Sequence, residues 1–279
     1  MAELGELVAA IVSHVADEND SCPFCPVPTQ GPFTTHPGSA NDSQVLEAIM
    51  KDPGKLTTRQ SNARPKSSQP QQQPTSSAKP KPNPIFSDAT YGDYSAEAHH
   101  LISGNQAMKG HEIEHWIVAG SLVTADTGYS INNSDNGEWL PSIPEQYKEQ
   151  GGWSSLMPAE KLRIASLPMK SKGQFHKGPH NITDKDDPSG LHVSYPKEVK
   201  RLLTDLCNVM HGWAEKCPLT KNSDPDKGPF TPNWRIHNML DHLSRAIATD
   251  LKADRSEWRY FISTLAMKYH NENCPHPVV

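Results

Sequence analysis

Hydrophobic residues recur at helical spacing in five segments of the 279-residue chain. The pattern predicts two short helices, over 1–16 and 43–51, and three longer ones, over 196–216, 233–251 and 256–271. The apolar stripes of the longer segments are Leu202, Leu203, Leu206, Val209, Met210 and Trp213, then Ile236, Leu240, Leu243 and Ile247, then Phe261, Leu265 and Met267. Stripes of this kind form a hydrophobic core far more often than a cofactor site.

Residues 53–84 interrupt these patterns. They contain seven Pro, five Ser and the run Gln71-Gln72-Gln73, and almost nothing apolar. Six bases and no acid lie in the segment, whereas residues 1–50 carry seven acids and no Lys or Arg. Such a composition predicts a disordered basic linker. We expect a solvated spacer here, with a weak tether to nucleic acid as the alternative.

Residues 85–195 contain shorter patterns that predict strands, a helix and a turn. His99 to Ile102 should end a strand, a helix is expected over 105–118, and the hairpin partner strand is expected within 128–140. The dipeptide Asn136-Gly137 is a hairpin turn signal. Residues 142–172 look like an insertion before the next motif.

Histidines at particular spacings carry the strongest chemical signal. His99 and His100 are adjacent, so on a strand they point to opposite faces and can take different roles. His176 and His180 are four residues apart, which on a helix would place both rings on one face, where they could share a metal. An imidazole base and a divalent ion are together sufficient for phosphodiester hydrolysis. With 14 His in the chain, however, a His pair by itself would more often be structural.

Taken in order, these motifs resemble a known nuclease family. Ala98-His99-His100-Leu101-Ile102, Ile131-Asn132, Asn136 to Pro141 and His176-x-Gly178-x-His180 are similar to the AHH branch of the HNH (ββα-metal) nuclease superfamily. The resemblance covers about 89–195. It implies that His100 is the general base, that His99, His176 and His180 bind the metal, and that Asn136 orders the loop and the base. Because 40 residues separate Asn136 from His176, His192 is an alternative ligand.

The resemblance also implies a biological setting. AHH modules are common in bacterial polymorphic toxins and type VI secretion effectors, so we expect a secreted antibacterial DNase with little sequence specificity, with RNA as a possible substrate. Such a toxin would need an immunity protein in its producer. The acidic segment 1–52 would be the part of the chain that binds secretion machinery or an adaptor protein. The metal would be Mg, Mn, Zn or Ni, since three His ligands and phosphoryl chemistry together select none of these ions.

Composition bounds these expectations. The net charge is −5, so a strongly basic nucleic-acid-binding domain is not expected, although a metal and a local basic patch could still bind phosphates. No run approaches the roughly 18 apolar residues of a membrane span. The start carries Glu3 and Glu6 and no Lys or Arg, unlike a secretory signal. We therefore expect a cytoplasmic protein in its producer that reaches a target cell without a cleaved signal and does not insert into membranes.

Two alternatives use other residues. His111-Glu112-x-x-His115 matches the zinc-protease motif H-E-x-x-H, in which two His bind zinc and the Glu is the base. No third ligand stands at the metzincin offsets, and Glu138 follows beside a turn. The other alternative is a non-enzymatic zinc-stabilised adaptor.

The adaptor alternative depends on Cys22-x-x-Cys25, which could hold a structural zinc with two further ligands such as Cys274 and His276. An odd count of five Cys and no signal peptide favour reduced thiols, so buried or idle thiols are the default expectation.

The combined prediction is a helix-rich α+β chain. We expect a small helical segment at 1–52, a linker at 53–84 and a nuclease domain at 85–279. That domain would hold the ββα-metal core at about 89–195 and a helical extension at 196–279.

Overall fold

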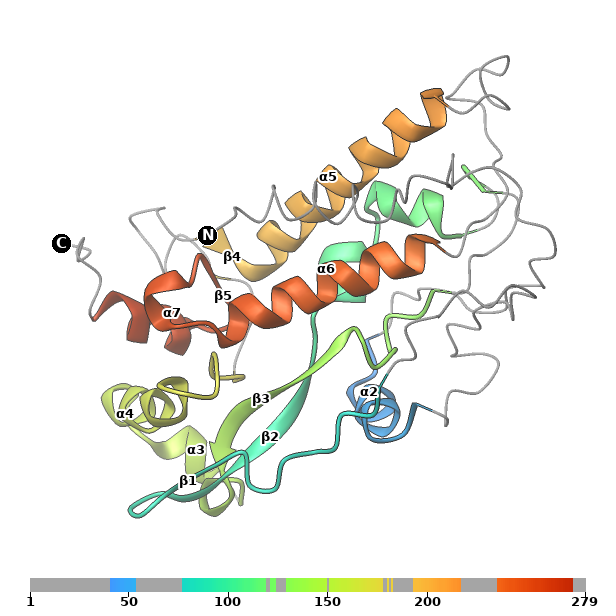
Figure 1. The fold of residues 1–279 in the computed structure, drawn as a ribbon. Coiled ribbons are helices and arrows are strands. Elements are labelled where there is room, and N and C mark those ends of the chain that lie inside the picture. The colour runs from blue at the N-terminus through green and yellow to red at the C-terminus, as the bar shows by residue number, and fades with distance from the viewer. Residues whose placement is uncertain are drawn as a thin grey trace. The chain divides into compact units, whose positions relative to one another are not determined.

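In the computed structural model the described residues are 41–53, 77–118, 121–123, 129–149, 151–177, 180, 182, 193–216 and 235–272. Helices and small sheets coexist, which confirms the predicted α+β class (Figure 1). None of the helices in this part of the chain is long and apolar enough to cross a bilayer.

The chain forms two compact units, each assembled from three stretches of sequence. Unit 1 is drawn from 1–79, 100–137 and 199–246, and unit 2 from 80–99, 138–198 and 247–279. Each unit therefore combines residues from the middle and the C-terminal third of the chain. The predicted division at 84/85 does not separate the two units.

Unit 1 includes a short N-terminal helix, α2 (Ser43–Lys51), as predicted. The Asp42 carboxylate caps it by accepting hydrogen bonds from the backbone N–H groups of Gln44 and Val45. Its buried face carries Leu46, Ile49 and Met50, and a side chain added at Gly137 would collide with Met50. The segment before the linker is thus packed into unit 1.

The prediction of a helix over 105–118 is wrong. The structure has a π-helical turn, η2 (Gly104–Met108), and a 3₁₀ turn, η3 (Glu112–Trp116). Gly110 separates them with a φ of +71°, a left-handed conformation that favours glycine and ends a helix. Both turns still bury apolar side chains such as Met108, Ile113 and Trp116, which is why the segment carries a helical pattern.

The long helices belong to the C-terminal third. α5 (Tyr195–Lys216) and α6 (Arg235–Lys252) agree with the prediction to within two residues. The third segment differs, because η6 (Arg255–Glu257) and strand β5 (Tyr260–Phe261) precede α7 (Thr264–Asn271). β5 pairs in parallel with β4 (Val193–Ser194), so part of the predicted helix is used for strand pairing.

Unit 2 is built on a three-stranded sheet of order β1-β2-β3. β1 (Phe86–Asp88) pairs antiparallel with β2 (Gly92–His100). β3 (Gly137–Pro144) begins at Gly137 itself, so the strand expected within 128–140 is wrong except for its last four residues, because residues 131–136 form turns and bends. Asn136-Gly137 therefore leads into β3 and does not join two strands of a hairpin. The insertion folds into η4 (Glu145–Tyr147), α3 (Gly152–Ser155) and α4 (Pro158–Met169). A cluster of buried apolar residues, including Tyr94, Ile164, Phe175, Phe261 and Met267, forms the core of unit 2.

The end of the predicted linker is ordered where the structure describes it. The ammonium of Lys79 donates a hydrogen bond to the Gly137 carbonyl at 2.6 Å in unit 1. In unit 2 the ammonium of Lys81 lies 5.3 Å from the centre of the Trp139 ring. The basic residues 79 and 81 are therefore used in contacts with the folded chain, and the predicted helix over 1–16 lies outside the described residues.

Candidate metal centre

Three histidines from distant parts of the sequence converge in unit 2. His99 is the penultimate residue of β2, whereas His176 and His180 lie after α4. One ligand nitrogen from each ring lies within 4.8 Å of the other two. The ring centres are 4.9 Å apart for His99–His176, and 5.0 Å for the other two pairs. Among the described residues this is the one group of three or more His, Cys, Asp or Glu that could hold a metal ion.

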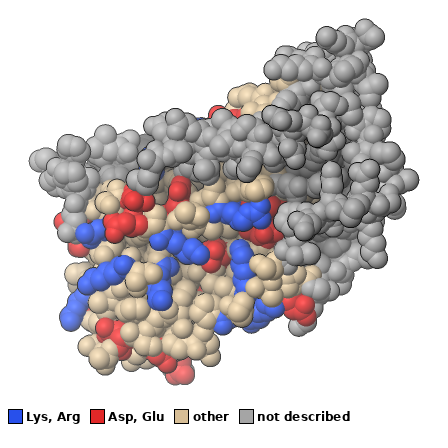
Figure 2. Space-filling view, in the orientation of Figure 1, with Lys and Arg blue, Asp and Glu red and all other residues tan. Residues whose placement is uncertain are grey.

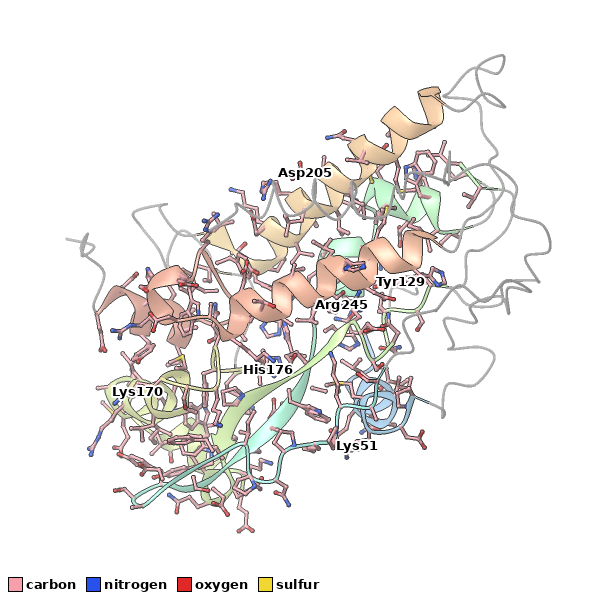
Figure 3. All side chains as sticks on the ribbon, viewed as in Figure 1. Lys51, Tyr129, Lys170, His176, Asp205 and Arg245 are labelled. Carbon is pink, nitrogen blue, oxygen red and sulfur yellow. The ribbon has the colours of Figure 1, made fainter. Side chains whose placement is uncertain are left out.

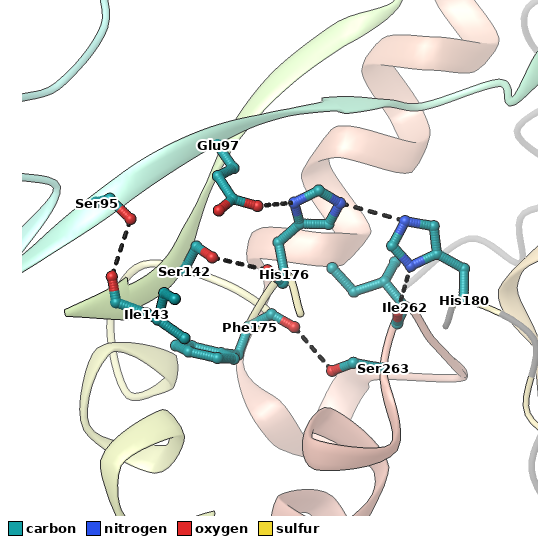
Figure 4. Close-up of polar contacts among 9 residues, drawn as sticks. All are labelled: Ser95, Glu97, Ser142, Ile143, Phe175, His176, His180, Ile262 and Ser263. Carbon is teal, nitrogen blue, oxygen red and sulfur yellow. Dashed lines mark hydrogen bonds and ion pairs between the residues drawn. The ribbon is translucent and has the colours of Figure 1, made fainter. Parts of the chain in front are cut away.

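The expected helix beneath His176 and His180 is not formed, because neither residue lies in a helix. Instead, the His176 backbone N–H donates to the Pro141 carbonyl at 2.7 Å, and Ser142 donates its hydroxyl to the His176 carbonyl at 3.0 Å (Figure 4). These bonds hold His176 alongside β3 in place of a helical turn. Gly178 and Pro179, the poorest helix formers, fall between the two histidines and lie outside the described residues.

The approach to His176 is anchored at Gly173 and Gln174. Gly173 has a φ of +89°, and an added Cβ would lie 2.8 Å from the Leu251 carbonyl oxygen. The Gln174 backbone N–H donates to that same carbonyl at 2.9 Å, and its side chain bonds Tyr260 and Ile262 of the β5 segment. His176 is thus reached from a tightly fixed segment.

His180 has a defined tautomer. Its Nδ1 lies 2.6 Å from the Ile262 carbonyl, which can only accept, so Nδ1 carries the proton and Nε2 has the lone pair (Figure 4). Burial, followed by the charge of His176, lowers the pKa of His180 to about 4, although the bond to Ile262 opposes this. At neutral pH the ring is therefore neutral, the form that binds a metal.

Glu97 forms an ion pair with His176. Its carboxylate lies 3.4 Å from His176 Nδ1, so a proton on Nδ1 is favoured and Nε2 keeps its lone pair (Figures 3 and 4). Burial would raise the pKa of Glu97, but the hydrogen bond and charge of His176 outweigh it, and the pKa is lowered. A carboxylate behind a ligating histidine is the usual outer partner of protein metal sites.

The two Nε2 atoms of His176 and His180 are 3.2 Å apart. If both rings are neutral with their proton on Nδ1, two lone pairs face each other, an arrangement that is stable only with a cation or a shared proton between them. Two nitrogens bound to zinc at about 2.0–2.1 Å in a tetrahedral shell would lie roughly 3.3 Å apart. The residues therefore fit a divalent ion, with His99, 2% exposed and packed against Tyr195, as the third ligand.

The candidate base His100 belongs to unit 1 and is 7% exposed. Its Nε2 lies 2.7 Å from Asn132 Oδ1. Since the backbone N–H of Asp42 also donates to Asn132 Oδ1, at 3.3 Å, this atom is the amide oxygen and accepts from both. His100 Nε2 therefore carries the proton, and Nδ1 has the lone pair that a general base needs.

The contacts of Asn136 match only part of the role expected for it. Its oxygen accepts from the Ile102 N–H at 2.7 Å and from the Ser244 hydroxyl at 3.0 Å. Its NH₂ group donates to the carbonyls of Ile102 and Ile131. Asn136 thus orders the loop, as expected, but the residue that contacts His100 is Asn132. The Ile131-Asn132 motif contained this residue, but nothing in its spacing distinguished its role.

The other candidate residues are placed less favourably. His192, Cys22 and Cys25 lie outside the described residues, as do Cys274 and His276. The buried thiol of Cys207 has a pKa raised to about 12 by burial and then by Glu112, so it is unreactive.

The H-E-x-x-H segment forms a 3₁₀ turn in place of an α-helix. His111 is its N-cap, with Nδ1 accepting from the Ile113 N–H and Nε2 next to the Thr204 hydroxyl. Glu112 pairs with His211 at 2.5 Å. The segment thus lacks the α-helical stacking of His111 on His115 that this zinc motif uses.

Comparison with known proteins adds no assignment. No protein-family model, curated protein or solved structure matches the chain. The function is therefore argued from the residues and their geometry.

Proposed function

We propose that the protein is a metal-dependent endonuclease that hydrolyses the phosphodiester bonds of nucleic acid. The observation that supports this most is the convergence of His99, His176 and His180, whose ligand atoms lie within 4.8 Å of one another. Glu97 and the Ile262 carbonyl hold two of these rings with Nε2 directed to a common point. Three protein ligands leave a coordination position for water or substrate, as in catalytic metal sites.

His100 is the proposed base. His100 follows the proposed metal ligand His99 directly in the sequence, and on a strand the rings of adjacent residues point to opposite faces. Asn132 holds the proton on His100 Nε2, so Nδ1 accepts the proton of the attacking water. A divalent ion, when bound to the three histidines, would stabilise negative charge on the phosphate oxygens. By resemblance to AHH modules, we further propose DNA as the substrate of an antibacterial toxin that is paired with an immunity protein.

The zinc-protease alternative has less support. His111 caps a 3₁₀ turn and Glu112 is engaged with His211, so neither is arranged as the motif requires. The adaptor alternative rests on Cys22 and Cys25, about which the described residues say nothing.

The test is incubation of the purified full-length chain with supercoiled plasmid and with total RNA, in Mg, Mn, Zn or Ni. We expect nicking that is abolished by EDTA and lowered at least about 100-fold in His100→Ala, the lower range for loss of a general base. The matched control is His111→Ala, which removes a partly exposed histidine of unit 1 and should cleave normally. Absence of cleavage with every metal and both nucleic acids would contradict the proposal.

A further inference from the structure

A basic pocket in unit 2 lies close in sequence to the metal ligands. It has a volume of about 490 Å³ and forms where the C-terminal ends of α4 and α6 meet η6, with Gly173 in its wall. Three cationic side chains line it: Lys170, Lys252 and Arg255. Figure 2 shows Lys and Arg side chains over the ends of α4 and α6, and Figure 3 marks Lys170 there.

The charge of the pocket is net positive. Among the described lining residues the one acid is Asp254, whose Oδ1 is occupied by the N–H and hydroxyl of Ser256, at 2.9 and 2.7 Å. The Lys252 ammonium forms an ion pair with Glu138 at 3.2 Å, and the Lys252 side chain is nearly half exposed. Lys170 is exposed, and the Arg255 guanidinium is held 4.5 Å from the centre of the Tyr269 ring. A pre-oriented Arg and exposed Lys side chains are what proteins use to bind phosphate groups.

The pocket is tied to the metal centre through one short segment. Gly173 lines the pocket and His176 is three residues further on, so their Cα atoms are at most about 11 Å apart. Gln174 between them bonds Leu251, next to Lys252, and also Ile262, whose carbonyl holds His180. Pocket and ligands are therefore joined by one short segment that is hydrogen-bonded at both ends.

We propose that this pocket binds a backbone phosphate of the substrate that flanks the phosphate at the metal. The inference rests on the proposed nuclease function and adds a second point of attachment for a polynucleotide, which a small phosphodiester could not use. Lys170 and Lys252 are the principal phosphate-binding residues.

Binding can be tested without catalysis. A fluorescently labelled single-stranded DNA oligonucleotide is titrated with full-length protein in EDTA, at several salt concentrations, and the Kd is measured by anisotropy. The double variant Lys170→Gln/Lys252→Gln should bind more weakly, and its dependence of log K on log salt should be shallower by roughly 0.7 for each phosphate that the protein no longer neutralises. Lys148→Gln, an exposed lysine of unit 2 outside the pocket, is the control for charge alone and should match the wild type.

Each outcome separates this inference from the proposed function. If the double variant keeps the wild-type Kd and salt dependence, or is weakened no more than Lys148→Gln, the pocket proposal is overturned even where the wild type cleaves plasmid. If the wild type binds no oligonucleotide but inorganic phosphate raises its Tm through the same lysines, the pocket is a free-anion site and the proposal is also overturned. A pocket-dependent Kd with no cleavage under any metal would support the pocket and contradict the nuclease.

Discussion

The roles of individual histidines depend on which ring nitrogen carries the proton. In His180 and His176 the Nδ1 side is held by the Ile262 carbonyl and by Glu97, so that both Nε2 atoms are directed to the same place. In His100 the Nε2 side is held by Asn132 instead. Histidines that lie close in sequence can therefore differ in chemistry, because their partners fix opposite tautomers.

Glu97→Gln tests the partner of His176. The amide removes the charge that stabilises the ligating ring, so we expect metal affinity to fall about 10- to 100-fold, the usual effect of losing an outer-shell partner. The Kd for Zn is measured by competition with a chromophoric chelator. Glu145→Gln, an exposed acid of unit 2, should leave the Kd unchanged. Equal affinity in Glu97→Gln and wild type would show that the pair does not support the ligand.

Asn132→Ala tests the partner of His100. Without the amide oxygen, the proton is no longer held on Nε2, so kcat for plasmid cleavage should fall while the Kd for Zn stays the same. Asn132→Asp keeps the acceptor and should recover part of the activity. A fall in Zn affinity equal to that in kcat would instead assign Asn132 a purely structural role.

His180 predicts a pH dependence of stability in the metal-free protein. Burial lowers its pKa to about 4 from the ordinary 6.5, so between these values the unfolded chain binds more protons than the folded one. Stability should therefore fall as pH drops from 6.5 towards 4, by up to about 1.4 kcal/mol per pH unit. Urea unfolding in EDTA at several pH values measures this, with His180→Asn as the comparison. An equally steep fall in the variant would rule out His180 as its source.

At the scale of elements, short segments depend on their contacts more than on their own propensity. The pattern at 105–118 is helical, yet Gly110 divides it into η2 and η3. The His176 segment follows β3 through the Pro141 carbonyl in place of a helix. The 43–51 prediction is confirmed as α2, because its cap at Asp42 and its apolar face are both local features.

Gly137→Ala tests the packing of α2 in unit 1. An added Cβ would lie 2.4 Å from Met50 Sδ and 3.0 Å from Leu46 Cδ1, so the helix or its side chains must move. We expect a loss of about 1–3 kcal/mol in the free energy of unfolding, as for other overpacked sites. In a double-mutant cycle, Met50→Ala should relieve part of this cost. Strictly additive effects would show that the two residues do not meet in solution.

At the scale of the molecule, neither compact unit is a continuous piece of sequence. Unit 1 joins α2 to residues 100–137 and 199–246, and His99 and His100, though adjacent, belong to different units. A boundary drawn from composition at 84/85 therefore separates segments that pack together. The compositional change marks a linker in sequence and says nothing about which segments share a core.

A truncated chain tests this assembly. A fragment of residues 85–279 lacks Leu46, Ile49 and Met50, each at most 2% exposed, and their burial contributes about 1.5–3 kcal/mol apiece. We expect its Tm to be well below that of a fragment of residues 41–279, with exposed apolar surface detected by dye binding. Equal Tm values for the two fragments would show that α2 is dispensable for unit 1.

The sequence by itself determined features that local periodicity and local chemistry encode: the α+β class, α2, α5 and α6, and the strand end at His99-His100. Its resemblance to AHH modules also selected the three histidines that the structure brings together. The tertiary structure alone decided that His176 and His180 meet His99 from a loop, that Asn132 contacts His100, that Glu97 lies behind His176, and that α2 belongs to unit 1. These are contacts between residues dozens of positions apart, and such pairings depend on how the elements pack, which the spacing of residues within one segment does not record.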